Sequence, residues 1–347
     1  MLWILLTLMS AALVALFLMP GSTPPLDRRH YPNAISVLER VPIRGVPQWV
    51  LIRSQDIAQP VLLFLHGGPG TSMLGLSRRD TRALERHFTV VHWDQRGAGK
   101  SFAASSGNAN DLTMQTFVAD TIALASHLCE RLQQQKIVLV GHSWGSAIGA
   151  LAVAERPELF AAYVGIGQMS HAARSERLSY DWTLERAQQL QHGAGLAKLR
   201  EIGPPPYTGE NWRTKFMAQR SLLARYGGEV HRSKLGAVPA VLSNVCSREY
   251  SMRDRMRYFR GILRSVAALG PELSHLDLFV QVPKLDVPVY FCLGRHDYEV
   301  PSTLAATYLD TLQAPQKQLR RNENYTHLPN HEEQTKFNQI IKKNILP

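Results

Sequence analysis

Residues 137–150 read IVLVGHSWGSAIGA, and this stretch decides the fold. The apolar run at its start is typical of a strand buried on both faces of a parallel sheet, and the small residues after Gly145 favour a helix. Between them lies the pattern Gly-x-Ser-x-Gly, with Ser143 at its centre. A sharp strand-to-helix turn of this kind presents a serine hydroxyl above the sheet, and its glycines let strand and helix pass closely. The stretch predicts a nucleophilic serine, with a purely structural turn as the alternative.

The same alternation of strand and helix extends along the chain. Further buried strands are predicted at 61–65, 88–93, 161–166 and 287–293, a last strand at 316–321, a hairpin at 37–44 and 48–53, and helices at 113–132, 144–156 and 332–341. This order predicts an α/β-hydrolase fold with a mostly parallel, doubly wound sheet. The alternation stops near Gly167 and resumes near Lys284, so we expect a core of residues 31–167 and 284–347 and an inserted helical cap of residues 168–283.

A second glycine-rich turn, His66-Gly67-Gly68-Pro69-Gly70, follows the strand at 61–65. Its glycines allow backbone N–H groups to point into one space. The N–H groups of Gly68 and Trp144 are therefore the candidate oxyanion hole. The alternative is a Gly-Pro turn that only ends a strand.

A serine nucleophile needs an acid and a histidine, which follow it in this order in the predicted fold. Asp297 comes directly after the strand at 287–293 and is the candidate acid. Its rival Glu299 is expected near the start of the helix that Pro301 opens. His327 lies in the last loop and is the candidate base, whereas His331 is expected to be a capping or surface residue.

The apolar composition of the N-terminal segment predicts contact with a membrane. From Leu2 to Met19 every residue except Thr7 and Ser10 is apolar, enough for about 27 Å of helix. Residues 1–20 therefore read as a hydrophobic helix that is either a retained transmembrane anchor or a signal sequence. The lack of a basic flank and of an Ala-x-Ala site favours the anchor. Arg28 and Arg29 then place the enzyme body in the cytoplasm, whereas cleavage makes it periplasmic or secreted.

Composition excludes several other classes. The net charge of +11 comes without zinc-finger spacing, RNA-binding aromatics or a basic arm, so an anionic membrane fits better than nucleic acid. The cysteines, Cys129, Cys246 and Cys292, have no metal-ligand spacing and are expected to be free thiols. Residues 94–101, Asp-Gln-Arg-Gly-Ala-Gly-Lys-Ser, lack the glycine spacing of a phosphate loop. We expect no metal and no cofactor.

Taken together, these motifs resemble those of the proline iminopeptidase group of α/β-hydrolases. The resemblance rests on residues 66–70, 94–101, 141–145, 294–297 and 324–329 and covers the sheet domain. It implies a helical cap, no cofactor and a triad of Ser143, Asp297 and His327. Tyr325 and Thr326 depart from the family, in which small residues usually stand at these positions.

The resemblance implies a substrate, but the cap leaves it open. The group's aminopeptidase activity depends on cap carboxylates that bind a free amino group, and the sequence offers Asp181, Glu185, Glu201, Glu210, Glu229, Glu249 and Asp254. The cap is also rich in arginine and lysine, which disfavours a cation-selective pocket. A peptide with an N-terminal proline or small residue is expected, with an ester or amide as the enzyme alternative. A membrane-anchored binding protein without turnover is the alternative from another class.

One cap segment has a second interpretation. Met252, Met256, Phe259, Leu263 and Val266 recur at helical spacing, with Arg253, Arg255, Arg257, Arg260 and Arg264 around them. An ordinary amphipathic helix over the active site explains this pattern. The other hypothesis is a cap that rests on anionic lipid and admits amphiphilic substrates.

Overall fold

A central sheet of eight strands organises the molecule. A computed structural model describes residue 19 and residues 21–105, 111–230, 233 and 235–345. The sheet order is β1-β2-β4-β3-β5-β6-β7-β8. The β1–β2 and β2–β4 pairs are antiparallel, and all other neighbours are parallel. The strands are β1 (Ile35–Ile43), β2 (Val46–Ser54), β3 (Val61–Leu65), β4 (Thr89–Asp94), β5 (Ile137–His142), β6 (Phe160–Ile166), β7 (Val289–Gly294) and β8 (Lys317–Asn322). Each predicted strand is confirmed within two residues.

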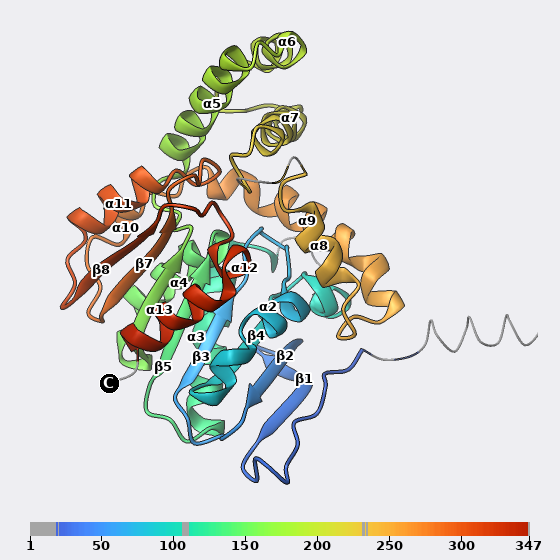
Figure 1. Ribbon diagram of the computed structural model, residues 1–347, viewed down its shortest axis with the longest axis vertical. Helices are drawn as coiled ribbons and strands as arrows, with labels where there is room; N and C mark the ends of the chain where they lie inside the picture. The colour runs from blue at the N-terminus through green and yellow to red at the C-terminus, as the bar shows by residue number, and fades with distance from the viewer. Residues whose placement is uncertain (1–18, 20, 106–110, 231–232, 234, 346–347) are drawn as a thin grey trace, which may run out of the picture.

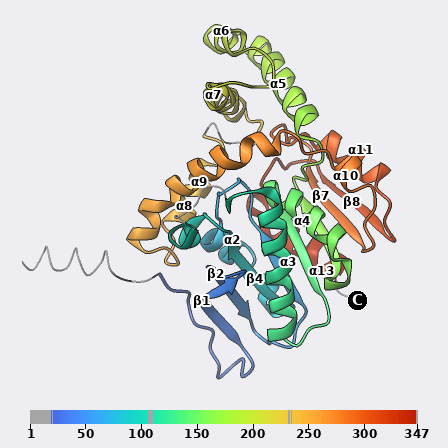
Figure 2. The same ribbon diagram turned by 180° about the vertical axis from the view of Figure 1, so that it is seen from behind.

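Helices cover both faces of this sheet (Figures 1 and 2). Strand β3 shows why. Leu63 packs into the cluster that contains residues of α3, α4 and α11, whereas Leu62 packs into the cluster that contains residues of α13. Full burial of each leucine contributes about 2 kcal/mol. The core helices are α2 (Leu74–Asp80), α3 (Met114–Arg131), α4 (Trp144–Glu155), α10 (Leu278–Gln281), α11 (Ser302–Thr311), α12 (Pro329–Glu332) and α13 (Gln334–Ile345), with 3-10 turns η1 (Arg82–Arg86), η2 (Gly99–Ser105) and η4 (Pro157–Leu159).

The predicted closing helix at 332–341 differs from the structure. Pro329 opens the short helix α12, and the chain leaves helical geometry at Glu333 before α13 begins. The side chain of Glu333 accepts a hydrogen bond from the Tyr325 hydroxyl, and Thr326 donates to Glu332. These contacts hold the segment against the preceding loop, so one continuous helix does not form.

Between β6 and β7, the five described helices that precede α10 form the cap: α5 (Ala172–Gln189), α6 (Gly193–Ile202), α7 (Trp212–Arg225), α8 (Val238–Val245) and α9 (Met252–Leu273). In Figure 1, α5, α6 and α7 project beyond the sheet, and α8 and α9 lie side by side across the core. All five fall inside residues 168–283, and these cap limits stay a prediction. Helix α9 begins with a capping box between Ser251 and Asp254.

The segment at residues 94–101 attaches α9 to the core. A Cβ atom on Gly261 of α9 would lie 2.7 Å from the Gly97 carbonyl oxygen, so only a glycine permits this approach. Lys100 Nζ donates to the Glu249 carbonyl at 2.9 Å and pairs with Asp254 at 2.7 Å. Asp94 accepts hydrogen bonds from the Ser72 hydroxyl, the Lys100 amide and the Tyr250 hydroxyl. Burial raises the pKa of Asp94 to about 6. The motif therefore has a structural role in this fold.

The predicted N-terminal hydrophobic helix falls on residues 1–20, of which only residue 19 is described. Across the described ranges, no helix combines the length and the apolar character that crossing a bilayer requires. All three cysteines are free thiols in the structure.

Candidate active site

Ser143 lies in a strained turn between β5 and α4. Its backbone has φ 52° and ψ −120°, a conformation that side-chain-bearing residues rarely adopt. A Cβ on Gly141 would lie 2.5 Å from the Gly145 carbonyl oxygen, and one on Gly145 would lie 2.4 Å from the Leu65 carbonyl oxygen. The two glycines are therefore required because neighbouring backbone occupies the space of a side chain. The Ser143 amide donates to the Ile166 carbonyl at 2.9 Å, which ties the turn to β6.

Asp297 and His327 meet beside this serine. Asp297 follows β7, His327 follows β8, and their parallel strands end at the same edge of the sheet. Asp297 Oδ2 lies 2.8 Å from His327 Nδ1, and Asp297 Oδ1 accepts a hydrogen bond from Val300 N at 2.9 Å. Gly167, at φ 51°, backs the pair, since a Cβ there would lie 2.9 Å from His327 Nδ1. The structure thus brings the three predicted triad residues together, and their catalytic role stays a prediction.

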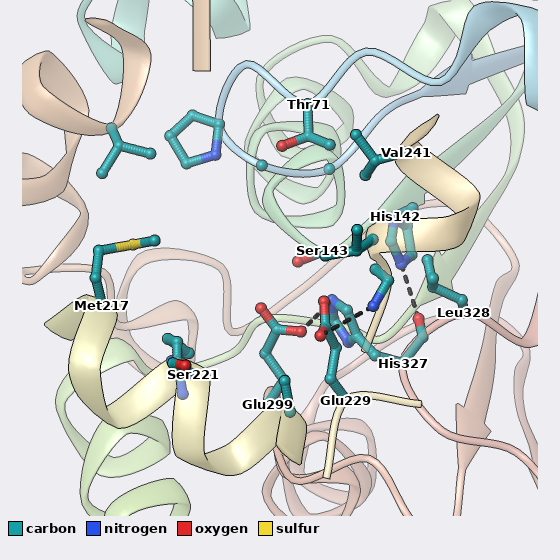
Figure 3. Close-up of a pocket in the computed structure, with 18 of the residues that line it drawn as sticks. Thr71, His142, Ser143, Met217, Ser221, Glu229, Val241, Glu299, His327 and Leu328 are labelled. Atoms are coloured by element: carbon teal, nitrogen blue, oxygen red, sulfur yellow. Dashed lines mark hydrogen bonds and ion pairs between the residues drawn. The ribbon is translucent and has the colours of Figure 1, made fainter. Parts of the chain in front are cut away.

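The histidine loop, residues 323–328, is held on several sides. His142 Nε2 donates to the His327 carbonyl at 2.8 Å (Figure 3). Burial lowers the pKa of His142 to about 3, so its ring is neutral and acts as a structural donor. The amide of Thr326 donates to Glu332 at 2.9 Å, and Tyr325 is buried. Of the two residues that depart from the family pattern, Thr326 therefore fixes this loop to α12, and Tyr325 fixes it to Glu333, directly after α12.

The predicted oxyanion donors lie on either side of Ser143. Gly68 lines the cavity above Ser143 and has φ 123°, followed by a cis peptide bond to Pro69. Trp144 is the first residue of α4, so its backbone N–H is among the unpaired donors of the helix amino terminus. Gln95 joins the two segments, because its side chain donates to the His66 carbonyl and accepts from the Trp144 indole. Their function as an oxyanion hole stays a prediction.

A cavity of about 810 Å³ opens onto Ser143 and His327. Its apolar walls come from the core and the cap and include Met73, Phe216, Met217, Val241, Val266 and Leu328. Figure 3 shows Glu229 and Glu299 beside the ring of His327 at one side of this space. The site therefore combines an apolar compartment with a negatively charged end.

Glu299 lies near the start of α11, as expected from Pro301, but its side chain also faces His327, which was not expected. Helix α11 begins at Ser302, so Glu299 lies before the helix, in the acid loop at residues 295–301. Its Oε2 atom is 3.9 Å from His327 Nε2, and this buried oxygen accepts no hydrogen bond from any described residue. The spacing Asp297-x-Glu299 was the available signal, because it puts two carboxylates into one short loop at the end of a strand.

Glu229 is the second carboxylate that sequence reasoning did not single out. Burial, and then the charge of Glu299, raise the pKa of Glu229 to about 7, while its Oε2 accepts a hydrogen bond from Ala237 N at 3.1 Å. Burial also raises the pKa of Asp297. For His327, burial favours the neutral ring, but the charges of Asp297, Glu299 and Glu229 outweigh it and raise the pKa to about 9. The surrounding carboxylates thus favour the protonated form of the imidazole.

The arginines of the cap offset this negative end only in part, since the charge of Arg220 acts on Glu229 without reversing the raised pKa of that carboxyl group. Arg220 lines the cavity, but its guanidinium donates to Glu176, to Ser179 at 2.6 Å and to Gln219 at 3.1 Å. Arg225 also lines the cavity and is exposed to solvent. The number of basic residues in the cap therefore overstates the positive charge next to His327.

The remaining candidate residues lie elsewhere. His331 lies inside α12 and is half-buried rather than at the surface, with its Nδ1 atom 3.2 Å from the buried Asp80 Oδ2. In the parts of the chain that the structure covers, no group of three or more His, Cys, Asp or Glu side chains is placed to hold one metal ion.

Comparison with known proteins agrees with this architecture. Residues 60–196 match the alpha/beta hydrolase fold family. The chain is 32% identical over 317 residues to the probable aminopeptidase YbaC of Bacillus subtilis, covering 90% of this chain and 96% of that protein. Two crystal structures share the fold. VinJ has a TM-score of 0.59 and 21% sequence identity, and the match covers 89% of this chain and 97% of VinJ. The proline iminopeptidase of Mycobacterium smegmatis has a TM-score of 0.55 and 19% identity, and the match covers 88% of this chain and 97% of that protein.

Gly145→Ala tests the close backbone approach under Ser143. The new Cβ would lie 2.4 Å from Leu65 O and 2.7 Å from His66 O, and neither backbone atom can rotate away. We expect the free energy of unfolding to fall by about 1–3 kcal/mol, measured as the midpoint of urea denaturation. Gly193→Ala is the matched control, because nothing lies within 4 Å of its Cβ position, and should change stability by less than about 0.5 kcal/mol. Equal midpoints for the two variants would contradict this explanation.

Proposed function

The chain belongs to the proline iminopeptidase-like group of the α/β-hydrolase superfamily and is a hydrolase, and we propose that it is an aminopeptidase that uses Ser143 as nucleophile. Its substrate is a peptide or arylamide with a free amino group and an apolar first residue. The observation that carries this proposal is the pair of carboxylates, Glu229 and Glu299, beside His327 in an otherwise apolar cavity.

In the proposed reaction His327 accepts the Ser143 proton while the serine oxygen attacks the scissile carbonyl. Asp297, 2.8 Å from Nδ1, orients the ring and stabilises the imidazolium. The N–H groups of Gly68 and Trp144 stabilise the oxyanion of the tetrahedral intermediate. His327 then protonates the leaving amine, and a water molecule that it activates releases the acyl group from Ser143.

The carboxylates are placed to select a cation. Glu299 Oε2 is buried without a hydrogen-bond donor, so an ammonium group would supply the partner that it lacks. Because this oxygen is 3.9 Å from His327 Nε2, an ammonium bound there lies within one residue of the reacting carbonyl. That short separation supports removal of a single N-terminal residue rather than cleavage inside a chain. The apolar walls formed by residues such as Phe216 and Val241 suit the side chain of that residue.

Substrate binding also affects the base. In the free enzyme Glu299 and Glu229 raise the pKa of His327, which keeps its ring protonated and unable to accept the serine proton. An ammonium group between the same carboxylates offsets their charge, so the pKa of His327 falls as a substrate with an amino group binds. The positively charged substrate therefore prepares the base that activates Ser143.

We also infer from the sequence that Leu2–Met19 attaches the enzyme to a membrane, with the body on the cytoplasmic side. Support comes from the length and apolar character of the segment and from Arg28 and Arg29 after it. The alternative, cleavage of a signal sequence, leaves a periplasmic or secreted enzyme.

Fractionation tests this attachment. The full chain should stay in the membrane pellet after washing with alkaline carbonate and should enter the supernatant only with detergent, because about 18 apolar residues span a bilayer core. Release by carbonate alone would contradict the anchor. An intact N-terminus, determined by mass spectrometry, separates a retained segment from a cleaved one.

Glu299→Gln tests amine recognition. We expect the KM for prolyl p-nitroanilide to rise about tenfold or more, since one charge-assisted contact contributes about 1.4 kcal/mol or more. Measured above pH 9, the kcat/KM for p-nitrophenyl butyrate, which has no amino group, should change less than about threefold. Glu185→Gln, on the exposed surface of α5, is the matched control and should leave both substrates unchanged.

Two results would decide against parts of this proposal. An equal loss for both substrates in Glu299→Gln would show that Glu299 only positions His327. Ser143→Ala should abolish hydrolysis of both substrates and labelling by a fluorophosphonate probe. Retained labelling in this variant would exclude Ser143 as the nucleophile and leave a binding protein or another nucleophile.

The pH dependence of ester hydrolysis reports the protonation of His327 in the free enzyme. The kcat/KM for p-nitrophenyl butyrate should rise with pH through the pKa of His327, about 9, because only the neutral ring accepts the serine proton. Glu299→Gln removes a negative charge that favours the imidazolium, so the midpoint should move to lower pH. An unchanged midpoint would show that Glu299 does not influence His327.

A further inference from the structure

The outer side of α9 exposes large apolar residues to solvent. Met256 and Leu263 are 64% and 68% exposed, and Met252 and Phe259 are 38% and 49% exposed. Spaced four, three and four residues apart, these side chains form one stripe, roughly opposite the buried positions Tyr258, Gly261 and Ser265. The described part of the chain leaves a large fraction of each of these side chains exposed, so this stripe is available to a partner.

Helix α8 extends this apolar surface. Leu242 and Cys246, one turn apart, are both exposed. Arg255 joins the two helices, because its guanidinium donates to the Cys246 carbonyl at 3.2 Å and lies 3.9 Å from the Met252 sulfur. We call the surface formed by Leu242, Cys246, Met252, Met256, Phe259 and Leu263 the α8–α9 face.

Arginines flank the apolar stripe on α9. Four of them share the adjacent side of the helix at helical spacing, namely Arg253, Arg257, Arg260 and Arg264. A helix with an apolar stripe beside a basic stripe is typical of a helix that lies in the interface of an anionic bilayer. A second copy of the chain fits less well, because a symmetric contact between two such faces would bring these arginines together.

The N-terminal segment reaches the core at this same place. The Ser22 amide donates to the Arg248 carbonyl at 3.0 Å, and Arg248 donates back to the Ser22 hydroxyl at 3.3 Å. Arg248 lies between α8 and α9, only four residues before Met252. The apolar sequence Leu2–Met19 therefore joins the folded body next to the α8–α9 face.

We propose that the α8–α9 face lies on the surface of an anionic phospholipid bilayer. Met252, Met256, Phe259 and Leu263 insert between the headgroups, and the neighbouring arginines bind lipid phosphates. This contact orients the cap relative to the membrane and does not depend on which substrate the enzyme cleaves. The attachment of the N-terminal chain beside the same helices supports a lipid surface as the occupant.

Lipid-dependent quenching of a probe on Cys246 tests the proposal in the full chain. The protein is reconstituted in vesicles of phosphatidylcholine alone or with 30% phosphatidylglycerol, both containing a lipid with a nitroxide near its headgroup. Cys129→Ser directs an environment-sensitive fluorophore to Cys246, since Cys292 is buried. We expect quenching at least about threefold stronger in the anionic vesicles.

A second position and a matched variant complete the experiment. A probe at Arg200→Cys, on the exposed surface of α6 and far from α8 in both views, should remain unquenched (Figures 1 and 2). The double variant Phe259→Ser, Leu263→Ser should reduce quenching at Cys246 to the level of the probe at position 200. Its circular dichroism spectrum and its ester hydrolysis should stay unchanged, because both side chains are exposed. Equal quenching at both positions, or no effect of the double substitution, would overturn the proposal. Disulfide cross-linking of two chains through Cys246 in detergent would overturn it in favour of a second copy.

Discussion

The backbone of Ser143 imposes the constraint on which the site depends. Its positive φ costs about 1–3 kcal/mol and persists only because β5 and α4 are held on both sides by the core. The turn also requires neighbouring backbone to pass where the side chains of residues 141 and 145 would otherwise stand. This turn directs the serine side chain into the cavity at the carboxyl ends of β7 and β8. The loops that carry Asp297 and His327 follow these two strands, so both loops lie on the same side of the sheet as Ser143.

In the function that we propose, the charges at this edge make His327 a poor general base until a cationic ligand binds. One buried imidazole faces three carboxylates, from Asp297, Glu299 and Glu229. Only Asp297 is needed to orient the ring. The other two add negative charge that a cationic ligand can neutralise, which links recognition of the ligand to the state of the base.

The cap is joined to the catalytic loops through backbone contacts. The Gly228 carbonyl accepts a hydrogen bond from Tyr298 N at 3.0 Å, and the Glu229 carbonyl accepts one from His327 N at 3.1 Å. Trp182 of α5 stacks on Tyr298, with ring centroids 4.1 Å apart. Displacement of the cap would therefore disturb the acid and histidine loops together, so the cap affects reactivity as well as access to Ser143.

The sequence by itself determined the sheet, the elbow and the chain order of Ser143, Asp297 and His327, because apolar runs and glycine spacing are local signals. It placed Glu299 near the start of α11 without showing that its side chain faces His327, and it left Glu229 as one of several cap acids. Their role is decided by folding, which brings a cap residue and an acid-loop residue, seventy positions apart in sequence, to the same imidazole. The charge of a cavity depends on which side chains face it and which are already paired, as Arg220 is with Glu176. The amino-acid composition does not distinguish charged side chains that face the cavity from those that are already paired elsewhere. Only the tertiary structure makes this distinction.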